Sequence, residues 1–170
     1  MKNEEKQRNY GLAIKLLSEQ NFAAAIIAGA AATILAAVAF GIFVATWTFA
    51  YGFAAVAVGI VIGLAMGLFG RGISTKFAVA AAVFTMIGCV LGNLFRVIMD
   101  RAQATGTSPI DVLGSDSFSA LARQAVSDGF SIYILYWFIA TIAAVFLSRR
   151  ALSRSDRLAI GLYESRCRDA

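Results

Sequence analysis

The chain has 170 residues, of which 59% are hydrophobic and only 15% are charged, and its formal net charge is +5. Its mean hydropathy of +0.75 excludes an ordinary soluble domain, which is roughly 45–50% apolar and about 25% charged. The composition predicts an all-α integral membrane protein, a bundle of about four transmembrane helices of roughly 20 residues each. The cations flank apolar segments, where they set the orientation of a membrane protein, so we expect no nucleic-acid partner.

Residues 1–21 form a polar cytosolic or interfacial segment in which Tyr10, Ala13, Ile14 and Leu17 recur at helical spacing. This spacing fits a short helix in the headgroup region, and it equally fits the first turns of the first span projecting into water. No small-residue cleavage site precedes the first apolar run, so we expect an uncleaved signal anchor.

Two spans are predicted in the uncharged stretch between Glu19 and Arg71, at about 22–45 and 53–70. The turn between them, TWTFAYG, carries a Trp and a Tyr that suit a membrane interface. The hairpin contains no ionisable side chain of the kind that relays ions across a membrane.

A glycine stripe follows one side of the second span, formed by Gly59, Gly63 and Gly67. Such a bare side lets the backbone of another helix approach closely, so that van der Waals contact supplies the attraction. We expect its partner in the first span, which carries a stripe of mostly small residues. That stripe comprises Ala25, Gly29, Ala32, Ala36 and Phe40.

The third span is predicted at about 77–97, with Gly88 and Gly92 on a face suited to close packing. Near its far end, Asn93 needs a hydrogen-bond partner from a neighbouring helix or a water, and Arg96 lies close enough to the boundary to snorkel. Together they form a possible polar or lipid site that would bind a lipid headgroup or backbone carbonyls of the following loop. The simpler alternative is a helix end capped by its own loop.

Residues 98–129 form the longest predicted loop. Ser108 and Pro109 are typical of a helix start, and Ser117 and Gly129 bracket a second amphipathic stretch. We expect two short amphipathic helices that lie across the mouth of the bundle.

The fourth span is predicted at about 130–148 and opens with an aromatic cluster. A basic cytosolic tail, 149–170, follows it. In this tail Leu158, Ile160 and Leu162 would form a last interfacial turn or contact the first twenty residues.

The distribution of Lys and Arg predicts the orientation. Twelve of the 15 lie in the two terminal segments and the 71–76 loop, and the others are Arg96, Arg101 and Arg123. By the positive-inside rule, both termini are cytosolic and the 98–129 loop faces outward.

Residues suited to catalysis or metal binding are sparse. The chain contains no histidine, which removes the commonest general base and metal ligand. We interpret Cys89, which has no ionisable neighbour in the sequence, as a small packing residue. Four aspartates of the outer segment offer the oxygen ligands that a hard cation prefers, but their spacing matches no calcium loop, and capping and solvation explain them more simply. These are Asp100, Asp111, Asp116 and Asp128. We expect no catalytic residue, no cofactor and no metal.

Two stretches, AVGIVIGLAMGLFGRG at 57–72 and IGCVLGNL at 87–94, precede a polar loop and an aromatic-led last span. This arrangement resembles a group of small four-span bacterial inner-membrane proteins of unassigned function, over roughly residues 22–148. The resemblance implies a bacterial inner-membrane location and no catalytic role. Members of that group carry an acidic residue in the first outer turn, so any ionic role of that turn would be absent from TWTFAYG.

These observations predict a non-catalytic inner-membrane scaffold, accessory subunit or lipid- or protein-binding bundle, not an enzyme. The expected partners are membrane lipids, together with another membrane protein or a second copy of the chain. The alternative is a small transporter or channel that is complete only as an oligomer, with Asn93 lining a polar path. The absence of an acidic residue from the first three predicted spans counts against that alternative.

Overall fold

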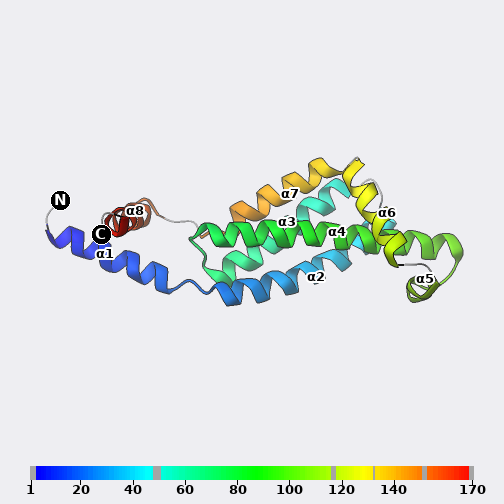
Figure 1. Cartoon of the computed structure of the whole chain (residues 1–170), viewed down its shortest axis with the longest axis horizontal. Coiled ribbons are helices and arrows are strands. Elements are labelled where there is room, and N and C mark those ends of the chain that lie inside the picture. The colour runs from blue at the N-terminus through cyan, green and yellow to red at the C-terminus, as the bar shows by residue number, and fades with distance from the viewer. Residues whose placement is uncertain (1–2, 48–50, 116–117, 132, 151–152, 169–170) are drawn as a thin grey trace.

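The computed structural model describes residues 3–47, 51–115, 118–131, 133–150 and 153–168. Within these ranges the regular secondary structure is α-helical and comprises eight helices (Figure 1). They are α1 (Asn3–Ser18), α2 (Phe22–Thr46), α3 (Tyr51–Gly70), α4 (Thr75–Thr105), α5 (Pro109–Ser115), α6 (Phe118–Ser131), α7 (Ile134–Leu147) and α8 (Arg154–Arg168).

Four apolar helices form the central bundle, in which α3 and α4 lie between α2 and α7 (Figure 1). Among the described residues, three helices are long and apolar enough to cross a membrane, namely α2, α3 and α4. The fourth bundle helix, α7, is equally apolar but has only 14 residues.

Two boundaries differ from the sequence prediction. The third predicted span ends near residue 97, but α4 continues to Thr105, where Gly106 adopts the left-handed conformation (φ 66°) that commonly ends a helix. The predicted 130–148 span is divided, because α6 extends to Ser131 and α7 begins only at Ile134. The middle of the TWTFAYG turn, residues 48–50, lies outside the described residues.

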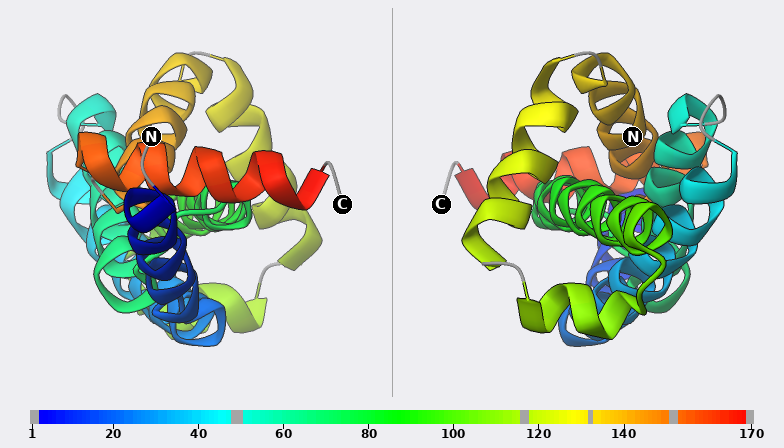
Figure 2. Two further views of the ribbon diagram at one scale, coloured as in Figure 1. Left: turned by 90° about the vertical axis from the view of Figure 1, so that its left-hand side faces the viewer. Right: turned by 90° about the vertical axis from the view of Figure 1, so that its right-hand side faces the viewer.

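Two short helices, α5 and α6, occupy most of the segment between α4 and α7 and lie beside the far end of α4 (Figure 2). A capping box begins α5: Ser108 Oγ accepts the Asp111 N–H at 3.2 Å, and Asp111 Oδ2 accepts the Ser108 N–H at 3.3 Å. The predicted cap of the second helix, Ser117, lies outside the described residues, as does Asp116.

The outer surface of the bundle carries large apolar side chains. Phe53 is 82% exposed and Phe146 is 76% exposed, and Leu35 and Leu68 are each 72% exposed. A helix that is apolar on its outward face as well as its inward face suits a hydrocarbon environment. The bundle therefore has the surface of a membrane protein.

The glycine stripe of α3 faces α7, which corrects the expectation that it would pair with α2. A Cβ placed on Gly59 would overlap the backbone of Ala140, and one placed on Gly63 would lie 2.8 Å from the Cα of Ala144. Gly67 meets the backbone of Leu147 in the same way. The small side chains of α7 recur at the same four-residue interval as the glycines, so the two parallel helices pack backbone against backbone.

The glycines of α4 also pack inside the chain. Gly88 lies against Val58 and Ile62 of α3, and Gly92 lies against the ring of Phe40 in α2. Gly29 of α2 lies against Met66 of α3 and Phe84 of α4, so the small face of α2 contacts both helices. The small-residue stripes predicted from the sequence therefore pack against other helices of the same chain.

A second, smaller unit lies off one end of the bundle, where α1 and α8 cross each other (Figures 1 and 2). Its buried residues include Leu16 of α1 and Ile160 of α8, and the rings of Tyr10 and Tyr163 are 5.3 Å apart. The tail thus contacts the first twenty residues, as one of the two predicted alternatives had it. Of the three apolar tail residues predicted for this contact, Ile160 is buried, whereas Leu158 and Leu162 are 64% and 45% exposed.

Hydrogen bonds join the connecting segments at this end of the bundle. The N–H of Asn21 donates to the carbonyl of Gly70 at 3.0 Å, and the N–H of Arg150 donates to the carbonyl of Gly72 at 2.9 Å. The Arg150 guanidinium also pairs with Glu19 at 2.9 Å. These contacts hold the ends of α2, α3 and α7 together.

Candidate functional site

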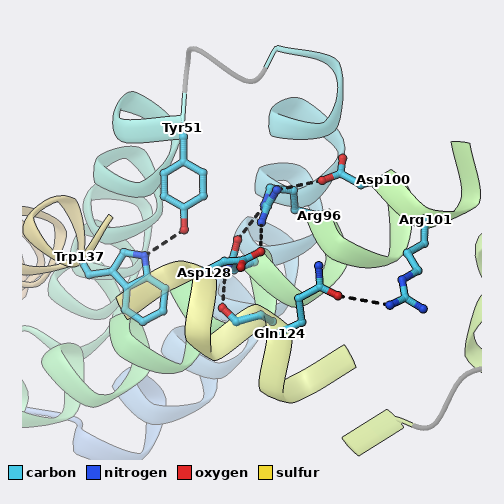
Figure 3. Close-up of polar contacts among 9 residues, drawn as sticks. Tyr51, Arg96, Asp100, Arg101, Gln124, Asp128 and Trp137 are labelled. Atoms are coloured by element: carbon cyan, nitrogen blue, oxygen red, sulfur yellow. Dashed lines mark hydrogen bonds and ion pairs between the residues drawn. The ribbon is translucent and has the colours of Figure 1, made fainter. Parts of the chain in front are cut away.

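The candidate site is a polar cluster where α4 leaves the bundle and passes beneath α6 (Figure 3). It contains both residues of the predicted polar site, Asn93 and Arg96. Asn93 is fully buried, and the side chain of Arg96 is 16% exposed. The spacing of three residues places both side chains on the same face of α4.

The side-chain amide of Asn93 forms hydrogen bonds through both its nitrogen and its oxygen. Its Nδ2 donates to the backbone carbonyl of Ala125 in α6, and its Oδ1 accepts the Nε–H of Arg96 at 2.8 Å. A buried amide without partners would cost about 1–3 kcal/mol. The α6 carbonyl is therefore the hydrogen-bond partner that the sequence required for Asn93.

Arg96 joins two carboxylates from different helices. Its Nη1 lies 2.9 Å from Asp100, one turn along α4, and its Nη2 lies 2.8 Å from Asp128 of α6. Because the planar guanidinium also donates through Nε, three of its nitrogens are oriented by α4 and α6 together. We call the set Asn93, Arg96, Asp100, Ala125 and Asp128 the α4–α6 latch.

Apolar packing accompanies the latch. A separate buried cluster forms where α4 meets α5 and α6, and its α6 members Leu121 and Ala125 are 0% and 1% exposed. The other members are Leu94, Val97, Ile98, Ala102 and Val112. The carbonyl that accepts from Asn93 belongs to this cluster, so burial of Ala125 and the hydrogen bond support the same position of α6.

An aromatic cluster lies next to the latch, at the same end of the bundle (Figure 3). Trp137 of α7 is buried and donates its Nε1–H to the Tyr51 hydroxyl of α3 at 3.3 Å. The Tyr51 ring stacks on Tyr133, with centroids 3.6 Å apart, and meets Phe40 of α2 edge-on at 5.1 Å. Of the aromatic residues that open the last predicted span, Trp137 is therefore buried in the bundle and Tyr133 packs against its core, whereas Tyr136 is 39% exposed.

Comparison with protein families, with curated proteins and with solved structures finds no match.

Three of the four aspartates that were weighed as cation ligands have other roles in the structure. Asp100 and Asp128 pair with Arg96, and Asp111 caps α5. Within the described ranges, no three His, Cys, Asp or Glu side chains come together as metal ligands. Cys89 is buried among apolar residues of the bundle core, in keeping with a packing role.

The sequence did not identify Asp128 as the partner of Arg96. The two residues are 32 positions apart, and no local pattern links them. One signal was available: Ala125 and Asp128 are three residues apart and so share a face of α6, as Asn93 and Arg96 do on α4.

The latch holds α4 and α6 together, and its arginine has little unpaired positive charge with which to bind an anionic ligand. Two carboxylates already contact the guanidinium, so a lipid phosphate at Arg96 would meet a local excess of negative charge. Of the two predicted ligands, a lipid headgroup or backbone carbonyls of the following segment, a backbone carbonyl is found for Asn93, whereas Arg96 binds the side chains of Asp100 and Asp128.

Proposed function

We propose that this protein is a non-catalytic bacterial inner-membrane bundle that works as a scaffold, accessory subunit or lipid- or protein-binding protein. In this proposal α2, α3, α4 and α7 cross the membrane, both termini and α8 are cytosolic, and α5 and α6 cover the outer end. The support comes from the course of α7, the composition of the bundle interior and the distribution of charge.

The course of α7 supports a fourth crossing. Tyr133, just before α7, stacks on Tyr51 at the start of α3, and Leu147 at the end of α7 meets Gly67 near the end of α3. The short helix therefore travels nearly the full height of a 20-residue helix that is long enough to span. A helix of 14 residues is about 21 Å long, and local thinning of the bilayer accommodates such a mismatch.

The apolar interior is the observation that carries the non-catalytic proposal. The buried residues between the four helices are mainly Ala, Val, Ile, Met and aromatic side chains. Two buried hydroxyls point back to their own helices: Thr33 donates to Gly29 O at 2.7 Å and Thr85 donates to Ala81 O at 2.8 Å. An interior of this kind builds a stable support, and binding then takes place on the outer surfaces.

The α1–α8 unit offers such a surface for a protein partner. Leu158 and Leu162 of α8 are 64% and 45% exposed, and Ile14 of α1 is 45% exposed. In the proposed orientation this unit stands in the cytosol, where exposed aliphatic side chains favour contact with another protein.

The test is gentle purification from native membranes followed by native mass spectrometry. The proposal predicts a partner protein or lipid at fixed stoichiometry, and Leu158→Ser should release a partner bound to α8. Leu113→Ser, which changes a 45% exposed leucine on α5, is the matched control and should keep the partner. A clean oligomer without partner or lipid that conducts solute in liposomes would refute the proposal in favour of the transporter or channel.

A further inference from the structure

The start of α4 lines a groove on the outside of the bundle, far from the α4–α6 latch. The groove has a volume of about 440 Å³ and lies between the first residues of α2 and the first two turns of α4. Its walls are Phe22, Val79 and Ala80, and Thr75 and Lys76 lie at its polar end.

The packing beneath the groove fixes its wall. The ring of Phe22 meets the buried ring of Phe77 edge-on, with centroids 5.3 Å apart. Phe77 in turn lies against Gly70 and Gly72, where any added Cβ would collide with its ring. These glycines let Phe77 sit deep enough to hold Phe22, so the groove belongs to the fold of this end of the bundle.

Lys76 supplies the charge at the polar end of the groove. Among the residues that the structure describes, no side chain forms an ion pair or hydrogen bond with the Lys76 ammonium. Lys76 differs in this from Arg96, which binds two carboxylates, and from Arg150, which binds Glu19. The groove thus combines an open apolar surface with a lysine that pairs with no side chain in the described part of the chain.

We propose that this groove binds an anionic phospholipid of the adjacent leaflet. An acyl chain would lie against Phe22 and Val79, and the phosphate would accept hydrogen bonds from the Lys76 ammonium and the Thr75 hydroxyl. A lysine at the end of a span reaches the headgroup level while its methylenes stay on the apolar surface. The inference rests on the membrane insertion proposed above and adds a specific lipid and place to it.

The experiment titrates the full-length protein with phosphatidylglycerol or phosphatidylcholine of identical acyl chains and counts bound lipids by native mass spectrometry. One basic residue near an anionic surface contributes about 1 kcal/mol, so Lys76→Gln should weaken phosphatidylglycerol binding roughly fivefold. The same change should leave phosphatidylcholine binding as it was. Arg123→Gln, at an exposed cation of α6, is the matched charge control and should alter neither.

A second variant tests the groove itself. Val79→Trp fills the channel and should weaken the binding of both lipids, whereas Val61→Trp, at a 47% exposed position of α3, should not. Unchanged lipid preference in Lys76→Gln, or an equal loss in Arg123→Gln, would overturn the assignment. Failure of the unaltered protein to insert into lipid nanodiscs would instead refute the membrane proposal, so the two failures are distinguishable.

Discussion

Replacing Gly63 by alanine tests whether α3 and α7 pack backbone against backbone. The new Cβ would lie 2.8 Å from the Cα and the carbonyl oxygen of Ala144, whereas ordinary contact begins at 3.4 Å. The two helices must therefore separate locally by about 0.6 Å, and a gap of that size forfeits a quarter to a half of the dispersion energy of the contacts it opens.

The magnitude follows from two opposing terms. Overpacking of this kind costs about 1–3 kcal/mol, and alanine in place of glycine returns about 0.5–1 kcal/mol of helix stability. From the mid-values of the two terms, we expect Gly63→Ala to lower the free energy of unfolding by roughly 1 kcal/mol. The measurement is unfolding in mixed micelles, followed by tryptophan fluorescence, to which Trp137 of α7 contributes together with Trp47.

Two controls isolate the cause. Gly161 of α8 has open space around its Cα, so Gly161→Ala should leave stability unchanged or raise it by about 0.5–1 kcal/mol. The double variant Gly63→Ala with Ala144→Gly should remain destabilised, because the atoms in the way belong to the Ala144 backbone. A Gly63→Ala protein as stable as the unaltered chain would refute the packing argument.

Three further outcomes are expected. Asn93→Ala removes the side-chain donor to the Ala125 carbonyl and the acceptor of the Arg96 Nε–H. At about 1–3 kcal/mol for such a loss, hydrogen exchange in α6 should become faster; unchanged exchange there would contradict the latch. Tyr51→Phe removes the oxygen that accepts from Trp137, so the free energy of unfolding should fall by about 0.5–1.5 kcal/mol; unchanged stability would contradict a contribution from this hydrogen bond. Ile160→Ala removes a buried aliphatic side chain between α1 and α8 and should expose α1 to protease while leaving the thermal unfolding of the bundle unchanged; equal protease resistance would refute the contact.

Local features could be predicted from the sequence because each depends on neighbours within a turn or two. The helix start at Pro109 and the small faces around Gly63 and Gly88 are of this kind. So is the need of Asn93 for a partner, since a polar amide deep in an apolar span must be satisfied somewhere. The sequence prediction ended the third span near residue 97 because the residues that follow are polar. Residues 98–105 contain no Gly or Pro, so nothing in them stops the helix, and α4 continues to Thr105.

Pairings between distant segments could not be predicted in the same way. A periodic stripe identifies which side of a helix is bare, but several other helices carry small residues that would fit it, and only the assembled bundle selected α7 as the neighbour of Gly63. The ion pair of Arg96 with Asp128 has the same origin, since it depends on where α6 crosses α4. The same crossing explains why Asp100 and Asp128, which were weighed as cation ligands, instead pair with Arg96.

The sequence by itself determined the apolar, helical character of the chain, because composition and hydropathy set the solvent in which each segment is stable. It also determined where close approach is possible, because only residues without bulky side chains permit it. The tertiary structure decided which faces meet: α3 on α7, α6 on α4, and α1 on α8. Such choices depend on the simultaneous fit of all helices, and no single segment contains that information.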